Sequence, residues 1–214
     1  GLGYGLRPET QLADLAGVPR RFDPRQQTWV PDGGVDGRTP AAGVYVAGDG
    51  AGILGADAAE LRGRRAALAL IEDLGLPTDA AEARALEAGI ARWARFRAAI
   101  DGMFPVPADA LAGLPDATVI CRCERITAGD IRRVAALGKP EDVNRLKAFG
   151  RAGMGRCQGR FCGDNAQALL AAITGRPRAE LGAQRAQPPV KPIPLADFAR
   201  TADNAEPIAE EAAQ

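Results

Sequence analysis

Four cysteines are the residues of this chain whose types and spacing could do chemistry. They form a C-x-C pair, Cys121 and Cys123, and a C-x4-C pair, Cys157 and Cys162, each with glycines nearby. Four thiolates directed at one point make up the ligand set of a [2Fe–2S] cluster or of a tetrahedral zinc ion. We therefore predict a metal centre held by these four residues.

The absence of histidine narrows the kind of centre. The sequence contains no histidine, which excludes a Rieske centre, a Cys/His zinc finger and any Ser-His or Cys-His triad. Disulfides are one alternative, but the cysteines of a C-x-C pair do not easily bridge each other, and 214 residues can form a core without such cross-links. Structural zinc is the stronger alternative, although its sites usually contain C-x2-C knuckles. The spacing favours iron–sulfur, and zinc stays open.

A second candidate site is a glycine-rich turn. The apolar, β-branched run Gly43–Asp49 predicts a strand, and the G-x-G-x-x-G sequence of Gly50–Gly55 leads from it into a predicted helix over residues 56–74. A dinucleotide-binding unit needs a second parallel strand after that helix, whereas another helix is predicted there.

The turn nevertheless combines a carboxylate, bare backbone amides and the positive end of a helix dipole, which suits a polyhydroxylated cofactor that bears phosphate. An ordinary strand-to-helix turn is the alternative. We predict cofactor contacts at four residues: Gly48, Asp49, Gly50 and Ala51.

The elements that must position these sites are mostly helices. In the N-terminal part we expect a short helix over residues 10–17, a strand at residues 28–30 in a hairpin, and a long helix that begins at the N-cap Thr78 and is stopped by Pro105. The long helix carries an apolar stripe: Leu86, Ile90, Trp93, Phe96, Ile100 and Met103. Around the cysteines, a capping box at Thr127 and Asp130 predicts a helix closed by Gly138, and further helices are predicted over residues 140–149 and 163–172.

These elements predict an α+β chain in four parts. Residues 1–104 form the part with the candidate cofactor turn, 105–115 a linker, 116–175 a small all-helical metal-binding domain, and 176–214 an extended or disordered tail. Within the tail we expect an extended strap near residues 188–194 and disorder after about Thr201.

Composition limits the partners. The chain carries 27 basic and 27 acidic residues, so its formal charge is zero, and no basic cluster is interleaved with aromatic residues, which argues against nucleic acid. No apolar run reaches the length of about 18 residues that would predict a membrane span. We expect a cytoplasmic protein. The first residue is glycine, which suggests the carboxyl-terminal piece of a longer chain.

The cysteine motifs resemble a known family. Residues 151–162, together with Cys121-Arg-Cys-Glu124, are similar to the ferredoxin domain related to bacterioferritin-associated ferredoxin (BFD), which occurs at the end of FAD-dependent dehydrogenases. Anaerobic glycerol-3-phosphate dehydrogenase and the FAD-binding subunits of opine oxidases and hydrogen cyanide synthase share it. The run Gly43–Asp49 resembles the last FAD-domain strand of flavoproteins of the pyridine-nucleotide-disulfide-oxidoreductase type, whose aspartate, here Asp49, holds the ribitol chain.

The resemblance implies an electron-transferring part of a flavin and iron–sulfur oxidoreductase that acts on an amine, opine, amino acid or hydroxy acid. It also implies that residues 1–104 are the C-terminal portion of an FAD/NAD(P)-binding oxidoreductase domain. The implied cofactors are a [2Fe–2S] cluster and FAD, for which this chain alone holds an incomplete site. Two partners are implied, a second flavin-containing dehydrogenase or oxidase and a small ferredoxin-like protein, each as a separate subunit. The competing interpretation is a non-catalytic module, stabilised by zinc or a cluster, that docks a dehydrogenase.

Overall fold

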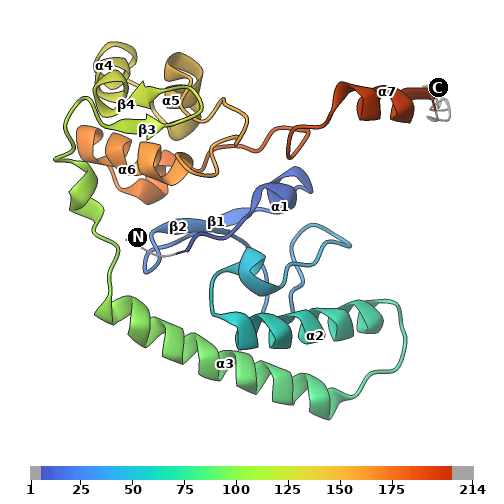
Figure 1. Cartoon of the computed structure of the whole chain (residues 1–214). Helices are drawn as coiled ribbons and strands as arrows, with labels where there is room; N and C mark the ends of the chain where they lie inside the picture. The colour runs from blue at the N-terminus through green and yellow to red at the C-terminus, as the bar shows by residue number, and fades with distance from the viewer. Residues whose placement is uncertain (1–5, 204–214) are drawn as a thin grey trace, which may run out of the picture.

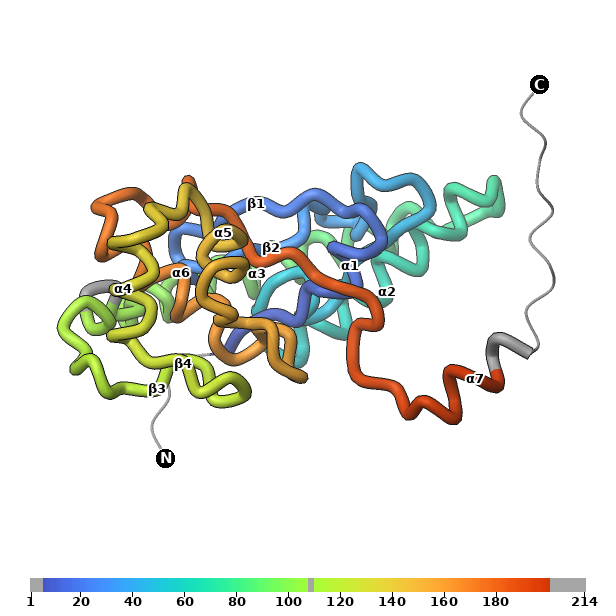
Figure 2. The backbone as a smooth tube through the Cα atoms, turned by 90° about the horizontal axis from the view of Figure 1, so that it is seen from above, coloured from blue at the N-terminus to red at the C-terminus, as the bar shows by residue number. Residues whose placement is uncertain are grey.

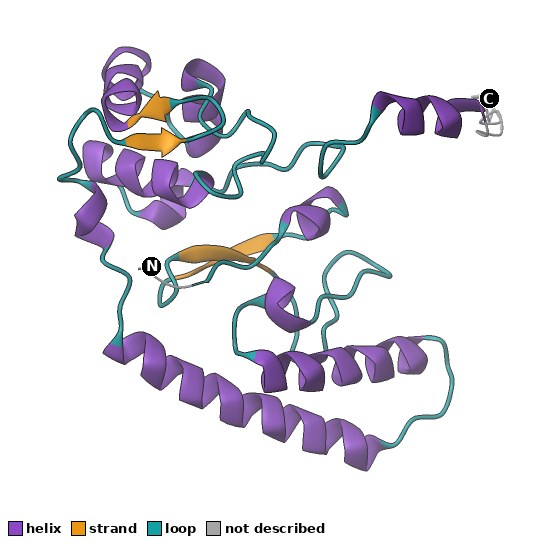
Figure 3. Ribbon diagram, in the orientation of Figure 1, coloured by secondary structure: helices purple, strands orange, loops and turns teal. Residues whose placement is uncertain are grey.

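The computed structural model describes residues 6–203 of the chain, and it is a mixture of helices and two short antiparallel hairpins. Figure 3 shows how small the share of strand is. The predicted combination of helices with a few strands is confirmed. The glycines of residues 1–5 lie outside the described part of the chain.

The N-terminal hairpin lies in the middle of the molecule. Helix α1 (Gln11–Leu15) leads into β1 (Arg20–Asp23) and β2 (Thr28–Pro31), which pair antiparallel with Arg20 opposite Pro31. The predicted short helix and hairpin are therefore confirmed. Both views place β1 and β2 between the helices that follow them and the cysteine-bearing region (Figures 1 and 2).

The strand predicted over Gly43–Asp49 does not form. Within residues 6–203 its backbone makes one isolated bridge, Tyr45 with Arg38, and the chain then enters the 3-10 helix η1 (Gly48–Ala51). The prediction was wrong because an apolar run becomes a strand only where a neighbour accepts its backbone hydrogen bonds. Beside that bridge the Val46 N–H donates to the Gly37 oxygen at 2.8 Å, but no second strand lies along the run in the described part of the chain.

Two long helices form an antiparallel pair at one end of the molecule. The first is α2 (Ala56–Asp73), as predicted, and the second is α3 (Ala80–Met103). The N-cap of α3 is Asp79 rather than the predicted Thr78, because the Asp79 carboxylate accepts from the Ala81 N–H at 2.7 Å. The apolar stripe is buried only near the start of α3, since Met103 is 68 % exposed.

The cysteine-bearing region contains three helices and a hairpin. A 3-10 helix, η2 (Ala108–Leu111), precedes β3 (Val119–Cys121) and β4 (Ile126–Thr127), and α4 (Ala128–Gly138), α5 (Val143–Gly150) and α6 (Gly163–Thr174) follow. The prediction of an all-helical region missed the hairpin, whose strands are too short for a periodic pattern. The predicted capping box between Thr127 and Asp130 is confirmed. The helix ends one residue later than predicted, at the left-handed C-cap Lys139.

After α6, the 3-10 helix η3 (Arg178–Leu181) covers the region's core, and residues 182–194 contain neither helix nor strand. This segment, called the strap below, includes residues 188–194, where an extended strap was expected. Helix α7 (Leu195–Asp203) was not predicted, and the disorder expected after Thr201 falls mostly on residues outside the described part. None of the described helices combines the length and the apolar character needed to cross a bilayer.

Candidate metal centre and flavin-contacting turn

Two loops carry the four cysteines to the N-terminal end of α6. Cys121 is the last residue of β3 and Cys123 lies in the turn to β4, while Cys157 lies in the loop after α5 and Cys162 directly precedes α6. Figure 1 shows β3, β4, α4, α5 and α6 together in one part of the molecule. All four thiols are free, with Cys121 and Cys162 buried and Cys123 exposed. The structure thus places all four predicted ligand residues in one part of the fold.

The thiols contact each other in two pairs. Cys121 lies beside Cys162, and Cys123 lies beside Cys157. The second loop approaches the first so closely at Gly155 that a Cβ atom added there would overlap the Cβ of Cys123. Glycine at position 155 therefore lets the two pairs meet.

Burial and mutual proximity oppose the ionisation of one thiol. Burial, followed by the neighbouring Cys121, Cys157 and Cys123, raises the pKa of Cys162 to about 12. A buried group surrounded by three further thiols cannot become a thiolate without a compensating positive charge. This is the environment in which a bound metal ion supplies the charge that the protein lacks.

Backbone hydrogen bonds favour ionisation of a second thiol. Burial raises the pKa of Cys157, but the backbone N–H of Phe161, the Cys123 thiol and the N–H groups of Gly159 and Arg160 donate to its sulfur, so its pKa lies below the ordinary value. Several N–H groups directed at one sulfur are the surroundings that iron–sulfur clusters have in proteins.

Within residues 6–203, no group of three or more Cys, Asp or Glu side chains is arranged to hold a metal ion. The sulfurs instead face each other pairwise. The donor set nevertheless fits an iron–sulfur cluster in its chemistry: it consists of four sulfurs, two of them buried, with N–H donors at one. The four cysteines are therefore the residues that would hold such a group.

The predicted cofactor contacts form a single turn at the start of α2. Gly48, Asp49, Gly50 and Ala51 make up η1, and Gly52 and Gly55, both with positive φ, connect it to the helix. The Asp49 carboxylate is exposed, so a ligand can reach it.

Arg62 is a residue of this turn that the sequence interpretation missed. It reaches back from α2, where its guanidinium donates to the Gly48 oxygen at 3.2 Å and to the Gly52 oxygen at 2.7 Å. Burial lowers the pKa of Arg62, and the charge of Asp49 partly offsets this. No local motif indicates this contact, because it depends on the fold of α2 back over η1.

The turn and the cysteine loop both contact the segment before α1. The Glu9 carboxylate pairs with Arg160, which lies between the second pair of cysteines, at 2.5 Å. A Cβ built on Gly50 would lie 3.6 Å from the Glu9 backbone oxygen. One residue therefore lies against both candidate sites, and nothing in its local sequence indicated that.

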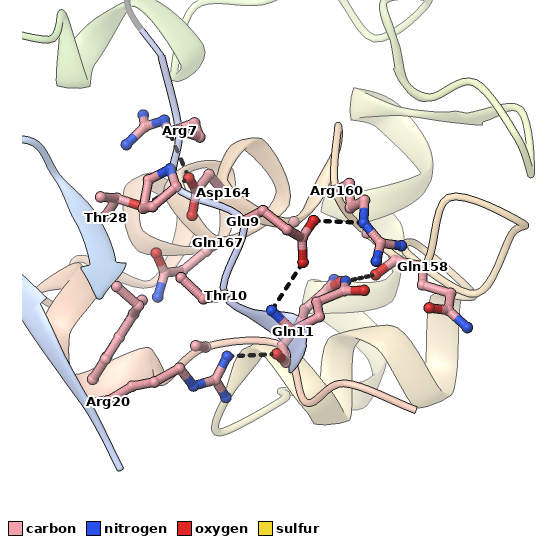
Figure 4. A pocket seen from close by; sticks show the side chains of 16 residues that line it. Arg7, Glu9, Thr10, Gln11, Arg20, Thr28, Gln158, Arg160, Asp164 and Gln167 are labelled. Atoms are coloured by element: carbon pink, nitrogen blue, oxygen red, sulfur yellow. Dashed lines mark hydrogen bonds and ion pairs between the residues drawn. The ribbon is translucent and has the colours of Figure 1, made fainter. Parts of the chain in front are cut away.

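Further contacts join the two halves around a cavity of about 210 Å³, shown in Figure 4. Thr28 of β2 donates to Asp164, the second residue of α6, at 3.1 Å, and Arg7 pairs with the same carboxylate at 3.2 Å. Gln11 donates to the Gln158 oxygen at 2.7 Å. These contacts hold the N-terminal hairpin against the end of α6 that carries Cys162.

Comparison with known proteins confirms the family resemblance. Residues 119–172 match the family model described as a BFD-like [2Fe-2S] binding domain. The chain is 42% identical over 202 residues to one of the opine oxidase subunits of Rhizobium meliloti, covering 93% of this chain and 38% of that protein. It is 36% identical over 202 residues to the hydrogen cyanide synthase subunit HcnB of Pseudomonas aeruginosa, covering 92% of this chain and 42% of that protein. The chain thus spans about two fifths of the length of these curated relatives.

Its fold is similar to that of a solved oxidoreductase. The crystal structure of L-proline dehydrogenase from P. horikoshii superposes with a TM-score of 0.73, at 22% sequence identity, over 90% of this chain and 37% of that one. This likeness shows the fold.

Proposed function

We propose that this chain is the electron-transferring part of an oxidoreductase and moves electrons between FAD and a [2Fe–2S] cluster. The range matched by the BFD-like model contains all four cysteines, which supports Cys121, Cys123, Cys157 and Cys162 as the cluster ligands. When bound, such a cluster accepts and releases single electrons. The buried Cys121 and Cys162 keep water from one side of the site, and the N–H donors at Cys157 stabilise its thiolate.

The turn Gly48–Ala51 is the proposed flavin contact. The Asp49 carboxylate would accept a hydrogen bond from a hydroxyl of the ribitol chain, and the backbone of Gly50 and Ala51 would approach the cofactor closely at the N-terminal side of α2. Arg62 holds the turn in shape by its two hydrogen bonds to Gly48 and Gly52.

The observation that carries the proposal is the position of Glu9 between the two sites. Its backbone oxygen lies 3.6 Å from the Cβ position of Gly50 and its carboxylate pairs with Arg160. The proposed flavin contact and the proposed cluster loop therefore lie against the same short segment. An arrangement that brings two redox sites together across a few residues suits electron transfer between them.

In this proposal residues 1–104 form the flavin-contacting part, 105–115 a linker, 116–175 the cluster-binding domain and 176–214 a strap and tail. The relatives are themselves named as subunits, which supports two partners for this chain. One is a second flavin-containing dehydrogenase or oxidase, and the other is a small ferredoxin-like protein. An amine, an opine, an amino acid or a hydroxy acid is the proposed class of substrate for the whole assembly.

Metal content tests the cluster. The chain purified without oxygen should be reddish-brown, with iron and acid-labile sulfide in equal amounts. Replacing Cys157 with serine should remove most of the colour, whereas serine at the exposed Ala91 of α3 should leave it unchanged. A colourless chain with stoichiometric zinc would instead support a non-catalytic interaction module.

Flavin affinity tests the turn. In FAD-loaded protein, Asp49→Ala should weaken FAD retention by about 1.5–3 kcal/mol, the value of a hydrogen bond to a charged group. Asp57→Ala is the matched control, because Asp57 is an exposed carboxylate in the first turn of α2. Equal FAD release from both variants would contradict a specific contact at Asp49.

A further inference from the structure

Gln184 lies inside the loop that carries the second cysteine pair, although it belongs to the strap after η3. Its Nε2 donates to the Ala152 oxygen at 3.1 Å. A Cβ atom built on Gly153 or Gly159 would overlap the Gln184 Oε1 atom, and one built on Gly163 would lie 3.4 Å from it. The loop therefore closes around this side chain, and glycine at these positions makes room for it.

The residues that pack on Gln184 are close neighbours of two proposed ligands. Gly159 lies two residues after Cys157, and Gly163 directly follows Cys162. A change in the side chain at position 184 would thus alter the backbone beside proposed cluster ligands. Gln184 also lies outside residues 119–172, the range matched by the BFD-like model.

The N-terminal half holds Gln184 in place. Arg20 of β1 donates to the Gln184 backbone oxygen at 3.0 Å and pairs with Asp14 at 3.2 Å. The other Asp14 oxygen accepts from the Ala186 N–H at 2.7 Å. Side chains of Arg20 and Asp14 are only 13% and 20% exposed, so solvent screens this clamp less than a surface pair. Figure 1 shows the strap leaving the cysteine-bearing region and passing α1.

The orientation of the Gln184 amide is fixed by chemistry. A backbone carbonyl can only accept, so the atom that faces Ala152 is the nitrogen, and Oε1 must point into the loop. In the described part of the chain this oxygen is buried without a donor. The negative end of a dipole is therefore fixed beside Gly153, Gly159 and Gly163 of the cysteine loop, where it disfavours the addition of an electron to a bound cluster.

We propose that Gln184 is a positioning residue of the cysteine loop, which it fills, and that its amide oxygen lowers the reduction potential of a cluster bound there. The inference rests on the proposed function, because it concerns a bound cluster. Through the Asp14–Arg20 clamp, the N-terminal half then contributes to the electronic surroundings of the metal centre.

The test compares matched variants of the whole chain after reconstitution with iron and sulfide. Gln184→Met keeps the length of the side chain and removes the amide oxygen, and Gln187→Met makes the same change at an exposed residue of the same strap. Redox titration followed by electron paramagnetic resonance of the reduced cluster measures the potential and the g values. We expect a higher potential and altered g values in Gln184→Met, and wild-type values in Gln187→Met.

A second variant covers the case in which Gln184→Met does not retain its cluster. Arg20→Met keeps the Gln184 side chain but removes the hydrogen bond from Arg20 to the Gln184 backbone oxygen. We expect a smaller rise of the reduction potential in this variant, with unchanged iron content. Wild-type potential and g values in Gln184→Met, or in Arg20→Met if that variant is the one measured, would overturn the inference alone. A wild-type chain that takes up no cluster would overturn the proposed function, and this inference with it.

Discussion

The cysteine-bearing region and the α2–α3 pair bury apolar surface in different ways. Around the cysteines a continuous cluster of nine buried residues joins α4, α5, α6 and η3: Ala128, Ile131, Ala135, Leu146, Ala152, Ala166, Leu169, Leu170 and Leu181. The buried residues of α2 are mostly alanines, and the last residue of α3 and its C-cap, Met103 and Phe104, are 68 % and 71 % exposed. The first region thus closes around a core of its own, whereas the second packs mostly through small side chains of α2 against Ala83, Leu86 and Ile90 of α3. We therefore expect substitutions in the cysteine-bearing region to destabilise that region and to leave the α2–α3 pair folded.

The largest expected effect concerns the metal ligands. Replacing Cys121 and Cys123 together with serine should destabilise the cysteine-bearing region by more than about 5 kcal/mol, since structural metal sites contribute about 10–16 kcal/mol in zinc-finger peptides. Hydrogen exchange resolved by segment should show faster exchange in α4 and α6 and unchanged exchange in α2 and α3. Undiminished protection of α4 and α6 would mean that the apolar core alone holds this region together.

A core residue should have the next largest effect. Ile131 of α4 is 1 % exposed, so Ile131→Ala should lower the free energy of unfolding of its region by about 2–5 kcal/mol through lost contacts and a cavity. Leu137 on the same helix is 83 % exposed, and Leu137→Ala should change that free energy by less than about 0.5 kcal/mol. Urea denaturation followed by circular dichroism measures both. Similar losses in the two variants would contradict a core centred on α4.

The helix cap of α3 should have a smaller effect, on the other region. Asp79→Ala removes the two hydrogen bonds from the carboxylate to the Ala81 and Glu82 N–H groups, at 2.7 and 3.3 Å, and should cost about 1 kcal/mol. Thr78→Ala is the control and should have little effect, because the N-cap of α3 is Asp79 and not Thr78. Thermal unfolding of the α2–α3 pair is the measurement, and a larger loss in Thr78→Ala would restore the cap that the sequence predicted.

Features that depend on nearby residues could be predicted from the sequence, and features that depend on distant residues could not. The helix after Thr127 was predicted because its capping box depends on Asp130, three residues away. The prediction of Thr78 as the N-cap failed because the next residue, Asp79, is an equally good cap and only the geometry of the turn selects between them. The strand over Gly43–Asp49 failed because strand formation depends on distant partners.

The residues of the candidate sites also fall into those with a local sequence signal and those without one. The cysteines were proposed as ligands from residue type and spacing alone, because four sulfurs are needed whatever the fold around them, and their role as ligands stays a prediction. Arg62, Glu9 and Gln184 could not be proposed in this way, since each acts on a site that is distant in the sequence or lies across a turn from it. Their residue types are common on protein surfaces and give no local signal of such contacts.

The smallest expected effect is electrostatic and belongs to the α2 end of the molecule. Arg38 donates to the Asp73 carboxylate at 3.0 Å, and Tyr45 also donates to it, so the pKa of Asp73 falls from 3.8 to about 2. Because the pKa is lower in the folded than in the unfolded chain, this stabilisation is complete above the unfolded value and is lost as the pH falls through the folded one. The cysteine-bearing region should not share this loss, because Asp73 lies on α2.

A nuclear magnetic resonance titration of the Asp73 side-chain carbon tests this directly. The wild-type midpoint should lie at about 2, and Arg38→Gln should raise it toward 3.8, because the guanidinium is the largest contributor to the shift. Arg92→Gln is the control, since it removes the same charge from an exposed position on α3 and should leave the midpoint unchanged. A wild-type midpoint near 3.8 would show that solvent screens the pair completely, and the acid sensitivity assigned to the α2 end would then have to come from another carboxylate.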